Sequence, residues 1–469
     1  MITAPYQDAV SLNKLYWLGL ICVVSIFLGY MLATNTSTLI LVSLAAAWLC
    51  LLPYHAPLSI CMAVATFSSA LILPYFLGRP FVWEFAALLG WTGVVVKVFM
   101  RRYAPGSAEQ IRKNKWLFIS AFGYCLVLIV TMFYRGFGLR IFGGTQMGGR
   151  FYFQQLACAI FPFLFVICRP TQATLVRLFQ VQCVLTLTYL VSDFVFSMAP
   201  QSLYFLLQFF ELPGDAVGFQ MKAGNFGIRR FQSLSFVSVG ILAFLLCRFN
   251  LRSFFTRTGV LLLPLAFSVL VVGLFSGHRI LLAILVPLFI FCGYSQRFFN
   301  IRHGIICVGV LTLLLGLTYT FARTFPLAVQ RAVSCLPGID TRTQARNDAM
   351  ATLETRRILR EVGINLAPQY FWIGRGFGQS ANVDYSLGWD QTGIELHLAV
   401  GKFYNGIIGL MVNTGIFGTV CMLIFLGSGT ILAWRIMHLI RVQGCNDTFG
   451  RVCSEIGRAS CRERVLLGV

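Results

Sequence analysis

The chain has 469 residues, of which 58% are hydrophobic and only 11% are charged, whereas charged residues make up about 25% of a typical soluble domain. This composition excludes a water-soluble globular protein. The 37 lysines and arginines outnumber the 16 acids, but they stand in short clusters between apolar stretches. A nucleic-acid-binding protein would instead gather its basic residues on one soluble domain, so the distribution argues against that class.

Apolar runs repeat along the whole chain. Because a helix needs about 20 apolar residues to cross the hydrocarbon core, they predict an all-α polytopic membrane protein with about 12 transmembrane helices. The first run is full length and predicts a span rather than a cleaved signal peptide. The last is long and glycine-interrupted, which predicts a re-entrant turn followed by one crossing. The predicted spans are 15–34, 38–53, 57–78, 81–100, 116–134, 151–168, 174–198, 231–247, 258–275, 279–295, 304–322 and 406–436.

Basic residues recur in alternate loops, and the positive-inside rule places those loops in the cytoplasm together with both termini. The residues in question are Arg101, Arg102, Arg112, Lys113, Lys115, Arg169, Arg177, Arg248, Arg252, Arg257, Arg297, Arg302, Arg435 and Arg441. The outward loops carry cations too, against this preference. They hold Arg135, Arg140, Arg150, Lys222, Arg229, Arg230, His278 and Arg279. A single outward arginine can simply extend to lipid headgroups, but Arg279 lies in a turn too short to form a domain.

Residues 323–402 differ from the rest of the chain, because they hold seven of the acids and have a soluble composition. We therefore expect three parts: a transmembrane bundle over 1–322, a periplasmic loop domain over 323–402, and a final re-entrant or transmembrane helix over 403–440. Within the loop, a helix is predicted from Thr341 to Val362, with Asp340 or Thr341 as N-cap and Gly363 as the stop. Apolar Ala345, Ala349, Leu353 and Leu359 recur along it at near-helical spacing.

Two motifs in the loop have more than one interpretation. Arg356, Arg357 and Arg360 share one helix face, which is either solvated or in contact with anionic headgroups or a substrate phosphate. The glycine cluster at 374–378 follows no βαβ unit, so it is not a nucleotide loop. It predicts a turn that presents Trp372 and Phe377 to the membrane surface or to a sugar ring.

Two further features bear on function. Most of the 15 cysteines lie in apolar runs, where they act as small apolar fillers, and histidine is scarce, so no metal site is expected. The segment 455–469 has no membrane pattern and resembles the translation of a sequencing-library adapter. It is set apart from the fold prediction as a probable artefact.

Several motifs in order resemble the O-antigen ligase and O-antigen polymerase superfamily. They are the helix starts GRF and IRRFQSLSF, the turn and helix SGHRILLAIL, the loop end WIGRGFGQS and the last helix FYNGIIGLMVNTGIFG, which together cover about residues 140–435. The resemblance implies a GT-C-like bundle in the bacterial inner membrane. It puts the first functional arginine at Arg229 or Arg230 and the second at Arg279. Asn405 fits the family's His-Asn motif, but Tyr404 stands where the family has His, and His397 is the only nearby histidine.

The superfamily transfers a saccharide from a polyprenyl-pyrophosphate-linked donor to a glycan or lipid A core acceptor. We therefore expect a metal-independent glycosyltransferase without a cofactor, whose partners are these substrates, membrane lipids and polysaccharide-assembly proteins. Arginine suits the leaving pyrophosphate because it stays charged and donates bidentate hydrogen bonds. The expected catalytic residues are His397 as base, with Tyr404 or Glu395 in reserve, and Arg230 and Arg279 on the pyrophosphate. Further substrate-binding residues are Arg229, Lys222, Arg150, Arg140, Tyr404 and Asn405.

The sequence leaves alternatives open. Within the enzyme class, a repeat-unit polymerase is preferred over a ligase, because Arg135, Arg140 and Arg150 could serve an acceptor pocket for a second lipid-linked chain. A transporter or lipid-linked sugar flippase is the second class. It has few candidate membrane carboxylates, chiefly Glu84 and Asp193, and no internal repeat. A receptor or purely structural protein would leave the outward arginines unexplained.

Overall fold

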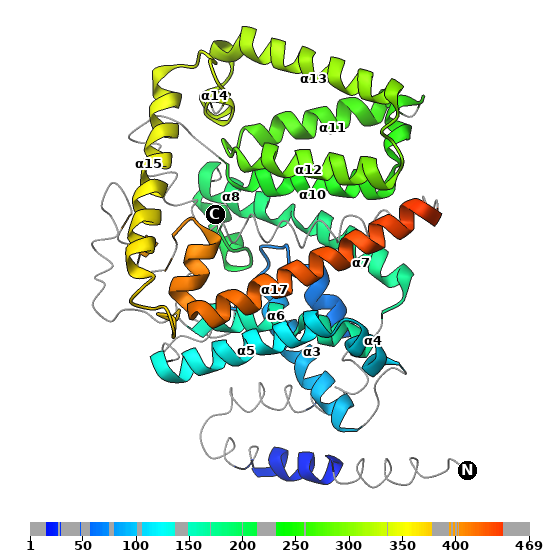
Figure 1. Cartoon of the computed structure of the whole chain (residues 1–469), viewed down its shortest axis with the longest axis vertical. Helices are drawn as coiled ribbons and strands as arrows, with labels where there is room; N and C mark the ends of the chain where they lie inside the picture. The colour runs from blue at the N-terminus through cyan, green and yellow to red at the C-terminus, as the bar shows by residue number, and fades with distance from the viewer. Residues whose placement is uncertain are drawn as a thin grey trace.

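A computed structural model gives the fold of most of the chain (Figure 1). It describes residues 16–26, 29, 47, 57–74, 79–100, 106–136, 149–168, 170–198, 200–212, 231–257, 259–334, 336–377, 394, 397–398, 401 and 403–443. Over these ranges the regular elements are helices, and the only β contacts are two isolated bridges, Leu71–Phe210 and Ile72–Phe81. The predicted all-α class is therefore confirmed.

One group of helices packs together around residues 115–135 and 149–168, and it includes the last helix that the structure describes. Its core is formed by Tyr124, Leu128, Tyr152 and Met422, which are all buried. The helices 115–135 and 406–443 run antiparallel and lie close together because glycines line their contact. A Cβ at Gly123 would lie 3.1 Å from the Cys421 sulfur. The helices are α3 (Val82–Phe99), α4 (Ser107–Lys113), α5 (Lys115–Arg135), α6 (Gly149–Cys168) and α17 (Gly406–Gln443).

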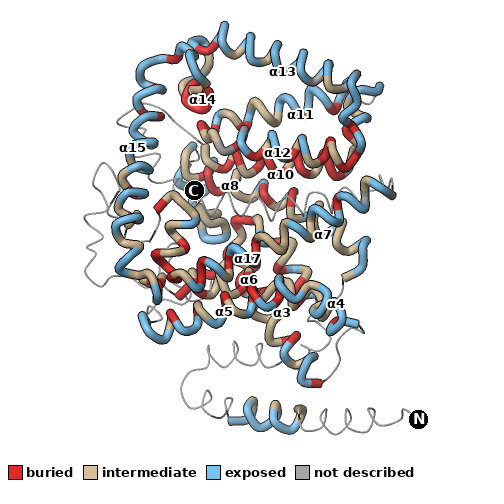
Figure 2. The backbone as a smooth tube through the Cα atoms, in the orientation of Figure 1, coloured by how far each residue is buried: buried red, intermediate tan, exposed pale blue. Residues whose placement is uncertain are grey.

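A second group packs around α10 (Ser233–Arg248), and it too relies on small residues. A Cβ at Gly240 would lie 2.3 Å from Thr186 Oγ1, and one at Gly273 would lie 2.5 Å from Ser238 Oγ, so only glycine allows these approaches. Figure 2 shows buried residues along α10 and α12 and mostly exposed ones along α13. The other helices are α7 (Gln172–Leu185), α8 (Thr188–Met198), η1 (Gln201–Gln208), η2 (Leu251–Phe255), α11 (Gly259–Leu274), α12 (Ile280–Ser295) and α13 (Ile301–Phe321).

The described residues include six helices that are long and apolar enough to cross a membrane: 82–99, 115–135, 149–168, 172–198, 304–324 and 406–439. Apolar side chains lie exposed on these helices, with Phe133 74% and Val95 67% exposed, as expected of a surface that contacts lipid. The chain is thus an all-α membrane protein. The first predicted span, 15–34, contains a described apolar helix, Tyr16–Ile26, which is shorter than a full crossing, and the second, 38–53, lies almost wholly outside the described residues.

The third predicted span, 57–78, is wrong as a single helix. The helix Pro57–Thr66 ends after ten residues, because Ser69 Oγ donates to Thr66 O and residues 71–72 form the two bridges. The spans predicted at 231–247, 258–275 and 279–295 are helices, but shorter than a full crossing.

The segment predicted as a periplasmic loop forms η3 (Ala322–Thr324), α14 (Leu327–Val333) and α15 (Thr343–Leu366). Figure 1 shows α15 running across the ends of the other helices rather than along them. The helix continues past its predicted stop, since Gly363 is buried inside it: a Cβ there would lie 2.9 Å from the Phe403 ring and 2.6 Å from Ile408. Gly363 serves a packing contact with the start of α17. No side chain caps α15 at its N-cap, Arg342.

Candidate functional site

The helix ends predicted to face outward gather at one end of the bundle, beside α15. Arg135, the last residue of α5, donates from Nε to Gly374 O at 3.0 Å. Tyr152 of α6 accepts a hydrogen bond on its hydroxyl from Phe377 N at 3.0 Å. Arg331 of α14 donates from Nη1 to Gly277 O, in the turn between α11 and α12, at 2.6 Å. We call this the α15 end of the bundle.

A histidine, a tyrosine and an arginine meet at the α15 end. The Tyr404 hydroxyl lies 3.1 Å from His397 Nε2, and the two rings pack edge to face at 5.0 Å. The Arg356 guanidinium lies 5.3 Å from the Tyr404 ring centroid, within cation–π range. Tyr404 has φ +51°, in the left-handed region that is uncommon for a bulky residue, and such outliers cluster at functional sites.

Asn405 follows this tyrosine and has a local structural role. Its side-chain Oδ1 accepts hydrogen bonds from Ile407 N at 3.1 Å and from Ile408 N at 3.2 Å. These backbone N–H groups lie in the first turn of α17, where no carbonyl is available to them. Asn405 therefore caps α17, which explains this residue type at this position.

Arg279, the second candidate, lies immediately before α12 and reaches toward the loop segment. Its Nη2 donates to Ser334 Oγ at 3.2 Å, and the residue is half-buried. Over the described residues it forms no ion pair with a carboxylate. Its charge is therefore held in place by a neutral hydroxyl and stays available to an anion.

The neighbouring Arg331 is already neutralised. It is 6% exposed, pairs through Nε with Asp348 Oδ2 at 2.5 Å and donates through Nη2 to Thr352 at 2.9 Å. Together with its bond to Gly277 O, this arginine ties α14 and α15 to the turn that carries Arg279. A buried pair of this kind fixes geometry, because either charge alone would be costly there.

One face of α15 connects the two groups. At about 100° per residue, Asp348, Thr352, Arg356 and Gly363 fall on the same side of this helix. The first two bind Arg331, the third lies over Tyr404, and the last packs on Phe403. Because eight residues span about 12 Å of helix, the Arg279 group and the His397 group lie about that far apart along α15.

A second buried ion pair lies where α3 and α6 begin. Glu84 Oε1 accepts from Arg150 Nε at 2.9 Å and from Gln154 Nε2 at 2.7 Å, while its Oε2 accepts from Phe81 N at 2.9 Å. Arg150 is 2% exposed and its guanidinium lies 4.6 Å from the Phe81 ring centroid. Arg150 is thus paired and buried, and it joins the two helix ends.

Glu211 adds a titratable group to this region. Burial raises the pKa of its carboxyl above the ordinary value and Glu84 adds to that rise, while Arg150 and Arg79 act in the opposite direction. Its backbone N donates to Ala70 O at 2.7 Å, next to the Leu71–Phe210 bridge. The charge of Arg150 therefore acts on the carboxyl of Glu211 as well as on its ion-pair partner Glu84.

The final helix α17 is broken at Gly415, which has φ +71°. The residues 371–376, which we call the strap, lie in this break. Arg375 N donates to Val412 O at 2.7 Å, Gly376 N to Asn413 O at 2.9 Å, and Ile416 N to Phe371 O at 2.7 Å. The strap thus satisfies backbone groups that an unbroken helix would pair internally.

Glycines permit the strap to approach α17 closely. A Cβ at Gly374 would lie 2.2 Å from Asn413 O, and one at Gly415 would lie 2.6 Å from Trp372 O. The glycines of this cluster therefore allow the strap to pack closely against α17. Of the two aromatic residues expected at its surface, Trp372 is 67% exposed, whereas Phe377 packs edge to face on Tyr152 with ring centroids 5.1 Å apart. The prediction that Phe377 is presented at the surface was therefore wrong.

Several predicted site residues lie outside the described part of the chain. They are Arg140, Lys222, Arg229, Arg230 and Glu395, so the structure brings together only part of the predicted set. The segment 455–469 lies outside it too. Of the described candidates, His397 and Tyr404 touch each other, Arg279 lies near Arg331, and Arg150 belongs to the separate pair with Glu84.

Sequence reasoning missed the partners that hold this site. Arg331 was not singled out, although its acid Asp348 stands between Ala345 and Ala349 on the apolar stripe of the predicted helix. An acid on a buried helix face is rarely buried without a partner, so Asp348 could have been used to predict a buried ion pair. No feature of the sequence indicated the contact of Arg356 with Tyr404.

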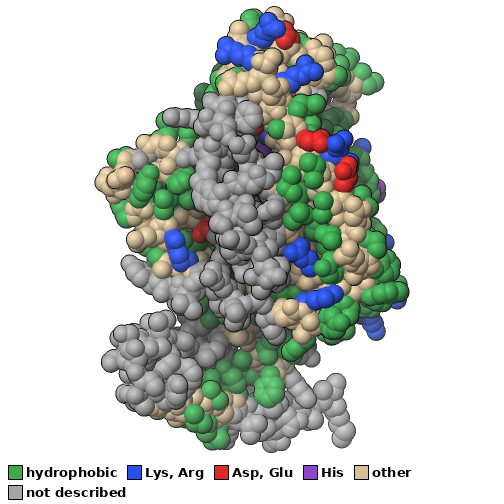
Figure 3. Space-filling model, turned by 90° about the vertical axis from the view of Figure 1, so that its left-hand side faces the viewer, with side chains coloured by type: hydrophobic (Ala, Val, Ile, Leu, Met, Phe, Trp, Pro, Cys, Tyr) green, Lys and Arg blue, Asp and Glu red, His purple; other side chains and the backbone are tan. Residues whose placement is uncertain are grey.

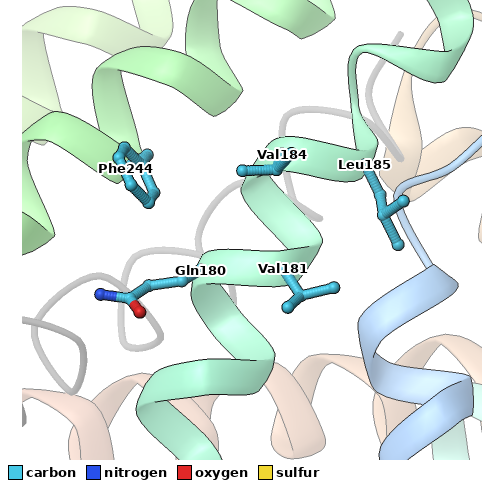
Figure 4. Close-up of a pocket in the computed structure, with 5 residues that line it drawn as sticks. All are labelled: Gln180, Val181, Val184, Leu185 and Phe244. Carbon is cyan, nitrogen blue, oxygen red and sulfur yellow. The ribbon is translucent and has the colours of Figure 1, made fainter.

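Figure 3 shows the α15 end face-on, with lysine, arginine and acidic side chains at its upper part and along its right side. A pocket of about 210 Å³ lies elsewhere, between α7 and α10 (Figure 4), and is lined by Gln180, Val181, Val184, Leu185 and Phe244. It holds no titratable group. In the described ranges, no three His, Cys, Asp or Glu side chains gather as a metal site.

Comparison of the chain with protein-family models and with curated proteins finds no match.

Proposed function

We propose that this protein transfers a saccharide from a polyprenyl-pyrophosphate-linked donor at the outer face of the bacterial inner membrane. The reaction uses arginine in place of a metal ion and needs no cofactor. The observation that carries the proposal is the arrangement at the α15 end. At this end, Arg279 and Arg356 have no carboxylate partner among the described residues. Both are connected through α15 to the His397–Tyr404 pair.

Arg279 binds the pyrophosphate in this proposal. When the bond between the anomeric carbon and the phosphate oxygen breaks, its electron pair passes to the pyrophosphate. A fixed guanidinium then stabilises the transition state more than the ground state. Arg331 and Asp348 support Arg279 through the turn at Gly277 and through α14. From the sequence motifs, the proposal adds Arg230 on the pyrophosphate, with Arg229 and Lys222 in support, and Arg140 as a substrate-binding residue on the acceptor side; all four lie outside the described residues.

His397 is the general base. The acceptor hydroxyl attacks the anomeric carbon, and its proton passes to the imidazole and then to water. Base catalysis of this kind contributes about 10²–10⁴-fold. The Tyr404 hydroxyl, 3.1 Å from Nε2, orients the ring, and the Arg356 guanidinium lies over that tyrosine on the acceptor side. The separation of about 12 Å along α15 is one that a pyrophosphate and a sugar ring together cover.

The preferred acceptor is a second lipid-linked chain, which makes the protein a surface-polysaccharide polymerase. A ligase would instead transfer the finished chain to lipid A core. Arg135 donates to the strap at Gly374 and Ile373, and Arg150 is paired with Glu84, so both position helix ends around the acceptor. Other partners in this proposal are membrane lipids and polysaccharide-assembly proteins.

A deletion strain tests the proposal. Surface polysaccharide is separated on a gel after complementation with wild type, Arg279→Ala or Arg435→Ala, the last being an exposed arginine at the opposite end of α17. We expect wild type and Arg435→Ala to restore long chains and Arg279→Ala to fail. Single repeats on lipid A core indicate a polymerase, and full chains on the carrier indicate a ligase. Normal polysaccharide in the deletion strain contradicts glycan transfer.

Transport is the second candidate, and the break in α17 favours it, because interrupted helices line substrate sites in many transporters. The membrane carboxylates argue against proton coupling. Glu84 is paired with Arg150, and Asp193 accepts hydrogen bonds from Ser233 N at 3.0 Å and Ser233 Oγ at 2.8 Å. Lipid-linked sugar that stays on the cytoplasmic side in the deletion strain would favour a flippase.

A further inference from the structure

We infer that Arg375 and Asn413 are positioning residues that hold His397 in register with the break in α17. The inference deepens the proposed function and rests on it, since it names what orients the base. Each of the two residues forms two hydrogen bonds, one through its backbone between the strap and α17 and one through its side chain to the carbonyl of Leu398 or of Gly401. Together they connect the strap, the residues that follow His397 and α17.

Arg375 makes the first connection. Its backbone N donates to Val412 O at 2.7 Å, and its side-chain Nη1 donates to Leu398 O at 2.7 Å. Leu398 directly follows His397, and its carbonyl also accepts from Gly401 N at 3.1 Å. The guanidinium thus fixes Leu398, and through it Gly401, to the strap. Charge-assisted bonds of this kind are about twice as strong as neutral ones.

Asn413 makes the second connection, from α17 two residues before the break at Gly415. Its carbonyl accepts from Gly376 N at 2.9 Å, and its side-chain Nδ2 donates to Gly401 O at 3.2 Å. The residue is 7% exposed, and a Cβ at Gly401, which has φ +73°, would lie 2.8 Å from its Oδ1. Gly401 is therefore required both for its backbone conformation and for the approach of the amide.

The break itself makes this arrangement necessary. Without a normal turn at Gly415, the carbonyls of Val412 and Asn413 would lose their helical partners at 416 and 417. The strap supplies N–H groups to both, so its position is set by α17. Because the same strap holds the carbonyl next to His397, any shift of the break moves the base. A base misplaced by about 1 Å can cost about 10²-fold in rate.

The test uses the full chain in lipid nanodiscs. Diethyl pyrocarbonate modifies His397 and His438, and mass spectrometry reads both rates. His438 lies in α17 beyond the break and is exposed, so it serves as an internal reference. The variants are Arg375→Ala, the conservative Arg375→Lys, and Arg346→Ala as a control that removes an exposed arginine of α15.

We expect Arg375→Ala to raise the His397 rate about ten-fold, as loss of one charge-assisted hydrogen bond predicts, with His438 unchanged. Arg375→Lys should restore most of the protection, and Arg346→Ala should have no effect. An unchanged His397 rate in Arg375→Ala overturns the assignment. So does an equal rise at both histidines, since Arg375 would then support the whole fold.

A second readout separates this inference from the proposed function. Where wild type transfers sugar, Arg375→Ala should lower kcat about 10²-fold and change its pH profile, with KM for the donor unchanged. If wild type transfers nothing, the proposed function fails, yet the His397 rates still decide whether Arg375 positions this residue.

Discussion

At the end of the bundle opposite α15, arginines bind backbone carbonyls. Arg297 Nε donates to Arg441 O at 2.9 Å and Arg252 Nη2 donates to Arg297 O at 3.3 Å, while the Arg441 guanidinium lies 4.0 Å from the Tyr294 ring centroid. These are ordinary roles for cations at helix C-termini. At the α15 end, Arg331 and Arg150 are buried against carboxylates, whereas Arg279 donates to the Ser334 hydroxyl and has no carboxylate partner among the described residues.

The difference shows that arginine alone does not indicate a site. The arginines of the opposite end bind backbone carbonyls at helix C-termini, and their removal should not disturb the structure of the neighbouring residues. At the α15 end, the paired Arg331 joins α14 and α15 to the turn that carries Arg279, whereas Arg279 and Arg356 have no carboxylate partner among the described residues. Function is expected from the unpaired cations and stability from the paired ones, and this division can be tested.

The largest expected effect comes from breaking a buried pair. Arg331→Met leaves Asp348 buried without its partner, which typically costs about 3–5 kcal/mol. The matched change at the opposite end, Arg297→Met, removes an exposed contact and should cost about 1 kcal/mol or less. Denaturant midpoints of both variants in detergent measure the difference. Equal midpoints would remove the distinction between the two ends.

The next effect is on rate. Arg279→Ala should lower glycosyl transfer by about 10²–10³-fold, the loss typical of one preorganised donor to a developing charge. The midpoint of unfolding should change little, since this arginine makes one hydrogen bond to Ser334. Arg279→Lys keeps the charge but not the bidentate geometry and should recover part of the rate. Steady-state transfer in nanodiscs is measured for wild type, Arg279→Ala and Arg279→Lys. A wild-type rate in Arg279→Ala would contradict the assignment of an anion site to this arginine.

A smaller effect is expected at the histidine. Tyr404→Phe keeps the ring beneath Arg356 and removes only the hydroxyl that bonds His397. The loss of one such hydrogen bond corresponds to about ten-fold in kcat. Because the ring remains, binding of the donor should not change. If KM rises and kcat does not, Tyr404 contacts substrate instead of orienting the base.

The smallest effect concerns pH. Burial raises the pKa of Glu211 in the folded protein, so the folded state binds its proton more tightly than the unfolded chain does. The stability that this proton contributes is present below the ordinary carboxyl pKa and is lost as pH rises through the folded pKa. Glu211→Gln should therefore flatten the pH dependence of the unfolding midpoint on the acidic side. An unchanged slope would show that the pKa of Glu211 is the same in the folded and the unfolded protein.

The sequence predicted what depends on local composition. The apolar run 116–134 matches α5 closely, the helix predicted at 341–362 overlaps α15, and the glycine-rich last span is interrupted at Gly415. Each of these follows from periodicity, charge or a single residue type. The acid Asp348 on the apolar stripe was also readable as a sign of a buried partner.

Features that depend on distant contacts could not be predicted. Gly363 looks like a helix stop until Phe403 and Ile408 are seen packed against it. Glu84 and Arg150 pair across 66 positions, and nothing near either residue names the other. The strap is the clearest case, because its glycines fit a surface turn equally well until the backbone of α17 is found to need its N–H groups.

Binding of a polyprenyl diphosphate to the full chain in nanodiscs tests the central claim most directly, because it needs no acceptor and no turnover. Kd is measured for wild type, Arg279→Ala and Arg297→Ala. The account predicts that the first of these substitutions weakens binding about ten-fold or more, as loss of a charge-assisted contact implies, and that the second leaves Kd unchanged. The same Kd for all three proteins, or a greater loss with Arg297→Ala, would contradict it.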